Sequence, residues 1–322
     1  MKSANISFSR ILSGFKRWFK DNMTQMRSAW SLYRAVAGRT AVFAGVLLVL
    51  PYAVLVLLAL RAVSFDLGAG MSMLTGVGYT ADWSYAIVGR LQALSSLSSL
   101  LSYATNLFLL PCACAAFAVL YWMRWQGMSL DIKSTWARVR PKVGRIIMVG
   151  LMVMLLSNVV QMVGSLANGL ISMVANIVGF IPVIGAIVYV LAYMISFAIV
   201  IAIALISLTA LMFAMLGMAD DNGGTSQLFM NTMRLMWGGR RDVVPALGFI
   251  MLAAVCVIIV CAVLYGILYA IAGATAAVIA IVVMLALLAC AAIPLVCAFI
   301  TVIYMNEHER QGGRTYIYTQ GF

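Results

Sequence analysis

The sequence is short of charge. Aspartate, glutamate, lysine and arginine make up only 9% of its 322 residues, whereas hydrophobic residues make up 65%. A soluble domain of this size carries charge on about a quarter of its residues. Apolar runs of roughly 20 residues recur along the chain, and that length crosses a bilayer as a helix. Because these runs lack the short alternation of a membrane β-barrel, the sequence predicts an all-α polytopic membrane protein.

The sequence also lacks the motifs of common active sites. It has one histidine, His308, and its neighbours Glu307 and Glu309 would point away from it on a helix. A metal site needs three or four converging ligands. No phosphate-binding loop, nucleophile elbow, HExxH motif or dinucleotide fingerprint is present. All six cysteines fall in apolar runs, where we interpret them as packing residues. We therefore expect no enzyme activity, no metal and no cofactor.

Basic residues are plentiful only between the apolar runs. The net charge of +12 could indicate nucleic-acid binding, but lysine and arginine flank the runs, which is typical of contact with anionic lipid headgroups. We predict six spans, at about 41–60, 97–121, 146–172, 183–216, 244–268 and 276–304. The charge-free segments 179–185 and 270–277 are expected to form tight hairpin turns.

The positions of the charges predict the orientation of the chain. Nineteen lysines and arginines fall on one side of the predicted threading, and only Arg61 and Arg90 fall on the other. The positive-inside rule then places both termini and both basic loops in the cytoplasm. The predicted organisation is a basic amphipathic region (1–40), one six-helix transmembrane domain (41–304) and a cytoplasmic tail (305–322).

The N-terminal region has the pattern of an amphipathic helix. Over residues 4–20, aromatic and aliphatic side chains share one face and basic side chains the opposite one. We expect this helix to lie on the inner leaflet, although a partner-binding helix is the alternative. The residues expected to anchor the chain at anionic headgroups are Arg10, Lys16, Arg17, Lys20, Trp30, Arg39, Trp136 and Arg145.

A segment before the first span resembles the one before the third. SAWSLYRAVAGR (28–39) and STWARVRPKVGR (134–145) align without a gap and share five identical residues, including the Trp and the final Gly-Arg. A looser copy, 225–244, precedes the fifth span. The repeated unit is predicted to be a short interfacial helix followed by a transmembrane hairpin, so that three units give six spans and a possible threefold repeat.

This layout resembles a broad group of bacterial six-helix membrane proteins. They include the membrane domain attached to some glycerophosphodiester phosphodiesterases, and the YciC-type membrane proteins. The resemblance is carried by the Ser-x-Trp…Gly-Arg segments, the segment 225–241, and the final span ending in FITVIYMNEHER (299–310). The catalytic domain of that family is a separate soluble barrel with no counterpart here. The resemblance therefore implies an architecture and no activity.

Two stripes of uncharged polar residues interrupt the apolar runs. On a helical wheel the polar residues of LSSLSSLLSYATN (94–106) share one face, and those of SNVVQMVGSLANGLISMVAN (157–176) share another. The depths match, in the half of the membrane away from the basic loops. We therefore predict that the stripes meet between the second and third spans. The candidate residues are Ser95, Ser99, Ser102, Asn106, Asn158, Gln161, Ser165 and Asn168.

Two uses of the stripes remain open. Their side chains could hydrogen-bond across a packed seam, or they could line a neutral crevice that binds a small polar molecule or a lipid headgroup. Two functional classes follow. The chain is expected to be a structural, assembly or accessory protein of the membrane, and the alternative is a transporter or permease-like subunit. A protein partner is possible, but the sequence does not identify one.

Overall fold

The described part of the chain is almost entirely helical, with no strand, and confirms the predicted all-α class. The computed structural model describes residues 2–54, 96–97, 99–128, 131–178, 184–220 and 225–310. Six of its helices are long and apolar enough to cross a membrane, as the sequence predicted. These candidate spans are Ser13–Val54, Ser99–Trp125, Ile132–Ile177, Met194–Ala219, Arg240–Cys261 and Ala286–Arg310. The loop 61–96 lies almost wholly outside the described residues.

The N-terminal region and the first span form one helix. The sequence predicted a separate surface helix, but α1 (Lys2–Ala44) runs without a break into the π-helical turn η1 (Gly45–Val49). A comparison of the two aligned segments explains the difference. Pro141 in the second copy has its counterpart in Ala35, which is a good helix former and interrupts nothing. The surface helix of the prediction is therefore the N-terminal extension of a span.

The other two segments form short separate helices before their spans, as predicted. The helix α5 (Ile132–Val139) leads through the 3₁₀ turn η3 (Arg140–Lys142) into α6 (Val143–Val178). The helix α8 (Thr225–Gly238) precedes α9 (Arg240–Arg310), and only Gly239 separates them. A Cβ at Gly239 would lie 2.9 Å from Oε2 of Glu307, so the absence of a side chain lets α8 turn beside a buried carboxylate.

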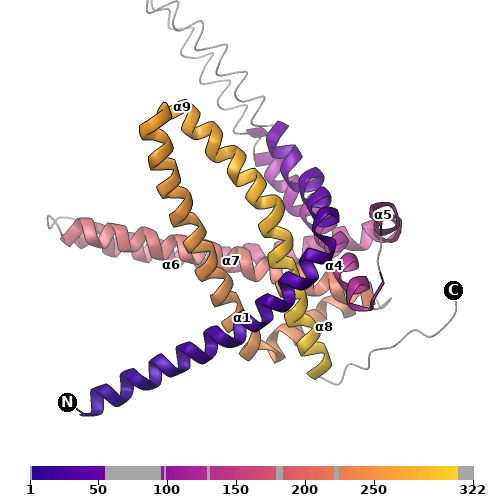
Figure 1. Ribbon diagram of the computed structural model, residues 1–322, viewed down its shortest axis with the longest axis horizontal. Helices are drawn as coiled ribbons and strands as arrows, with labels where there is room; N and C mark the ends of the chain where they lie inside the picture. The colour runs from indigo at the N-terminus through magenta and orange to yellow at the C-terminus, as the bar shows by residue number, and fades with distance from the viewer. Residues whose placement is uncertain are drawn as a thin grey trace, which may run out of the picture.

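The fifth and sixth spans belong to the single helix α9, and no turn divides them. The predicted tight turn at 270–277 is wrong, because the backbone there is helical. A straight helix of this length would extend about 100 Å at 1.5 Å per residue. Its ends nevertheless meet, since Arg310 at the end of α9 forms an ion pair with Asp242 near its start. The helix therefore folds back on itself, as Figure 1 shows. A bend keeps backbone groups paired within the helix, as an apolar medium requires.

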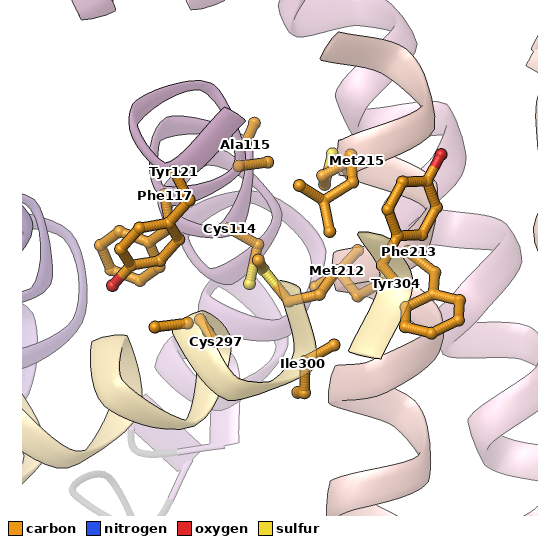
Figure 2. Packing of buried hydrophobic residues seen from close by; sticks show 14 of the residues in the cluster. Cys114, Ala115, Phe117, Tyr121, Met212, Phe213, Met215, Cys297, Ile300 and Tyr304 are labelled. Carbon is orange, nitrogen blue, oxygen red and sulfur yellow. The ribbon is translucent and has the colours of Figure 1, made fainter. Parts of the chain in front are cut away.

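The buried core gathers at the end of the molecule that holds α5 and α8, which we call the basic end. Its centre is α4 (Leu110–Trp125), whose segment 113–118 is almost wholly alanine and cysteine and is buried on every side. Around it lie the end of α7 (Ile184–Asp220) and the end of α9. In Figure 2, Cys114 of α4 lies beside Cys297 of α9. Small side chains let these helices approach closely.

Away from the basic end the hairpins separate. Figure 1 shows the α6–α7 hairpin and the folded α9 pointing in different directions from a common centre. The exposure of the side chains follows this division. Most apolar residues of α6 beyond Val153 are exposed, and so are those of α9 from Leu252 to Leu264. Exposed apolar surface of this extent on spanning helices is surface for lipid.

Two prolines inside α9 offer carbonyl groups to other helices. The hydroxyl of Tyr121 donates to the carbonyl of Pro294 at 2.7 Å, and the indole Nε1 of Trp18 donates to the carbonyl of Pro245 at 3.1 Å. A carbonyl oxygen has two lone pairs, so it can accept a side-chain donor in addition to a bond within its own helix. These bonds hold α4 and α1 against the two arms of α9.

The second helices of the first and third hairpins also resemble each other. PCACAAFAVLY (111–121) and PLVCAFITVIY (294–304) align without a gap and share Pro, Cys, Ala, Val and Tyr at equivalent positions. The equivalent tyrosines, Tyr121 and Tyr304, are both buried in the core. This similarity supports the threefold repeat, which stays a prediction.

The bond from Tyr121 gives a first test of the core. We expect Tyr121→Phe to lower the free energy of unfolding by about 0.6–1.5 kcal/mol, because a buried hydrogen bond is lost while the ring is kept. Unfolding in detergent, followed by circular dichroism, measures the effect. The control is Tyr52→Phe at an exposed tyrosine, which should leave stability unchanged. Equal losses in both variants would contradict the role given to the Tyr121–Pro294 bond.

Candidate functional site

A cavity of about 720 Å³ opens where the α6–α7 hairpin separates from the first hairpin. Its walls come from the helical residues 99–103, the π-helical turn η2 (Thr105–Leu109), α6 and α7. The volume lies within the range of about 300–1,000 Å³ that is typical of small-molecule sites. The cavity begins about 8 Å above Arg145 and extends beyond Asn158, about 20 Å above it, at 1.5 Å per residue of α6.

The cavity has a polar part and an apolar wall, and none of the described residues that line it is charged. The apolar wall is formed mainly by α7, with Val200, Ile203 and Leu208 among its residues. The polar lining side chains are Ser99, Ser102, Tyr103, Asn106, Ser157, Asn158, Gln161 and Ser207. A cavity of this composition suits a ligand that is polar at one end and carries no net charge.

The structure brings five of the eight predicted stripe residues together in this cavity. They are Ser99, Ser102, Asn106, Asn158 and Gln161. Ser102, Asn106, Asn158 and Gln161 are exposed to the cavity or its mouth. In the part of the chain that the structure describes, Asn106, Asn158 and Gln161 make no side-chain hydrogen bond to another residue. These amides therefore face open space, and they do not close a seam.

The other three stripe residues lie elsewhere. Ser165 is exposed on α6 beyond the cavity, and Asn168 is half-buried with an Oδ1 atom that has no partner among the described residues. Ser95 lies outside the described residues. Farther along the same stripe, Asn176 accepts a hydrogen bond from the hydroxyl of Tyr189 at 2.8 Å. At Asn176 the distal part of the stripe thus joins α6 to α7.

Close packing of α6 on its neighbours defines the floor and the back of the cavity. At the floor, a Cβ on Gly150 would lie 2.6 Å from Cγ of Pro111 and 3.3 Å from the carbonyl oxygen of Leu107. At the back, the hydroxyl of Ser207 on α7 donates to that of Ser157 at 2.8 Å. The partner of the α6 stripe at this depth is therefore α7 as well as the second span.

Sequence reasoning missed three polar residues of the cavity. Ser157 immediately precedes the stripe residue Asn158, and Tyr103 lies within the first stripe, so the same helical wheels could have included them. Ser207 stands in an otherwise apolar run of α7, and only the fold shows that it faces α6. The π-helical turn η2 was also missed. Such turns often lie at functional sites, and here it positions Asn106.

The predicted surface anchors are distributed along the basic end. Lys16, Arg17 and Lys20 are exposed on α1, Trp30 and Trp136 are 51% and 40% exposed, and Arg39 and Arg145 are half-buried. The side chain of Arg10 lies outside the described set. Their contact with lipid headgroups stays a prediction.

Part of the aromatic face of α1 packs on protein. The rings of Trp18 and Phe19 lie 6.0 and 5.7 Å from that of Phe249 on α9. Phe15, by contrast, is 53% exposed. The face that the sequence assigned to the membrane surface is therefore shared between α9 and the exterior.

His308 is not part of a metal centre in the described structure. Its ring stacks on that of Tyr304, with centroids 5.7 Å apart. No group of three or more histidine, cysteine or acidic side chains converges anywhere among the described residues. All six cysteines are free thiols.

Comparison with protein-family models, with curated proteins and with solved structures found no match. The class of protein therefore follows from the fold itself. Six long apolar helices, with their buried core at one end, make the chain an integral, multi-pass membrane protein.

The close approach at Gly150 gives a test of the floor of the cavity. We expect Gly150→Ala to lower stability by about 1–3 kcal/mol, because the rigid ring of Pro111 cannot move out of the way. The matched control on the same helix is Gly144→Ala, where nothing lies within 4 Å of the new methyl group. It should be neutral or stabilising by up to about 1 kcal/mol. Thermal unfolding in detergent compares the two, and an equal response would refute the close contact.

Proposed function

We propose that this chain is a non-enzymatic accessory protein of a bacterial inner membrane, with both termini in the cytoplasm. In this proposal its polar cavity holds the uncharged polar part of a ligand. The observation that carries the proposal is the set of cavity amides without hydrogen-bond partners in the described part of the chain. Asn106, Asn158 and Gln161 stand on two elements around one cavity. Amides facing hydrocarbon without a partner are costly, so a bound polar group or water is needed there.

The lining defines the class of ligand. Amide and hydroxyl groups offer both donors and acceptors, whereas no lining residue offers a charge. An ion would enter such a site without compensation for its lost hydration, and an uncharged polar or zwitterionic group meets a smaller cost. The apolar wall of α7 suits a hydrocarbon portion beside the polar group. An amphiphile that enters sideways between the diverging hairpins fits both walls.

A transporter or permease-like subunit is the second candidate. It is favoured by the position of the cavity between two hairpins that diverge, since such pairs can move against each other around a central site. It requires flux of the ligand across the membrane. Proteoliposomes that contain the protein would then release a trapped neutral solute faster than empty ones. Binding without flux supports the accessory role.

The amides on α6 test the proposal. We expect the double variant Asn158→Leu, Gln161→Leu to lose a neutral molecule that copurifies with the natural protein, because apolar side chains would replace the groups that bind it. Mass spectrometry of small molecules and lipids extracted from both proteins measures the difference. The unfolding temperature of the ligand-free protein should not fall, since the natural amides bond to no described protein group.

A matched control separates the cavity from the helix. Ser165→Leu with Ser172→Leu changes two exposed polar residues of α6 outside the cavity, and its copurifying molecules should match those of the natural protein. Identical extracts from all three proteins would argue against a ligand. A clear loss of stability in the ligand-free cavity variant would instead favour the hydrogen-bonded seam.

A further inference from the structure

A second, smaller cavity lies at the basic end and has a different chemistry. It encloses about 330 Å³ between α4, the α5–η3 segment, the start of α6 and the end of α7. Its walls are mainly apolar and rich in methionine, with Met123, Met215 and Ile146 among them. Two cationic side chains, Arg138 and Lys142, complete the lining. The pocket therefore combines positive charge with a hydrocarbon-like wall.

Both cations are half-buried, and the protein gives them only neutral partners. Nη1 of Arg138 lies 3.5 Å from the thioether sulfur of Met123, which is a weak acceptor. Nζ of Lys142 donates to the carbonyl of Met218 at 3.1 Å. Within the described part of the chain, neither cation forms an ion pair with a carboxylate. Capping the end of α7 explains the position of Lys142, but no carboxylate among the described residues pairs with the charge of Arg138.

The surroundings add positive charge. Arg145, one turn along α6, lies within electrostatic range of Lys142, as does Arg138 itself. Like charges gathered in a partly buried place repel one another and are stabilised by a shared anion. Trp136, on the neighbouring turn, is 40% exposed, as is usual for a tryptophan at the headgroup level of a bilayer.

We propose that this pocket binds the phosphate group of an anionic phospholipid, with Arg138 and Lys142 as the residues that hold the phosphate oxygens. The planar guanidinium of arginine can donate two parallel hydrogen bonds to a phosphate, and lysine adds a point charge. The methionine-rich wall then faces the glycerol and the upper acyl chain. This site is independent of the neutral cavity of the proposed function, because the two share no lining residue.

Native mass spectrometry of the delipidated protein in detergent tests the proposal, with phosphatidylglycerol as the probe. We expect Arg138→Gln with Lys142→Gln to weaken binding of the tightest phosphatidylglycerol molecule by about ten-fold or more, because two charge-assisted contacts are lost. The control, Lys133→Gln with Arg140→Gln, removes the same charge from exposed positions of the same segment. It should change binding by less than about two-fold. Equal weakening in both variants would overturn the site, since general attraction to the surface would then explain binding.

Two measurements on the natural protein keep the test valid if the variant does not fold. Phosphatidylglycerol should raise the unfolding temperature more than diacylglycerol with the same acyl chains, which lacks the phosphate. An equal rise would overturn the proposal. The bound phosphate group could belong to a phospholipid or to free inorganic phosphate, and a competition experiment with inorganic phosphate distinguishes the two. Weak competition by millimolar phosphate supports a lipid, whereas phosphate that binds as tightly as the lipid would show a site for the free anion and refute the assignment.

Discussion

Close packing around the small residues of α4 is the contact on which the rest of this fold depends. In a bilayer the hydrophobic effect does not drive helices together, because lipid chains are as apolar as leucine side chains. Association then comes from contact area, which small residues increase by letting backbones approach. The segment 113–118 of α4 is almost free of exposure and meets α1, α7 and α9. All three hairpins are joined there, at the basic end.

Because the core is confined to one end, the hairpins are free to diverge toward the other, and the neutral cavity lies where they begin to do so. The same medium governs the backbone. A turn in hydrocarbon leaves N–H and C=O groups unpaired, so the bend in α9 stays helical, and Arg310 pairs with Asp242 where the two ends of the helix meet. Such a medium tolerates irregular helices whose backbone groups stay paired. The examples here are the bend in α9, the π-helical turns η1 and η2, and the proline carbonyls that accept bonds from side chains of other helices.

The sequence predicted what depends on composition and on helical periodicity, and it missed what depends on contacts between distant segments. Apolar length was enough to find six spans, and the wheels placed Asn106 and Asn158 on faces that the fold brings to one cavity. The continuous helix 2–44 depends on Ala35 standing where the second copy has Pro141, which local comparison could have weighed. By contrast, the bend in α9 brings Arg310 to Asp242 across 68 positions, and Ser207 faces α6 only because α7 packs there.

The two candidate sites differ in charge because they differ in depth. A charge within the hydrocarbon is costly unless it is paired. The polar groups among the described lining residues of the neutral cavity are accordingly amides and hydroxyls. At the basic end, water and headgroups lie near, so Arg138 and Lys142 can be half-buried at a tolerable cost, and an anion lowers that cost further. Both cavities border α6 and α7. A ligand in either one would contact the α6–α7 hairpin, and could thereby set the angle of this hairpin relative to the rest of the molecule.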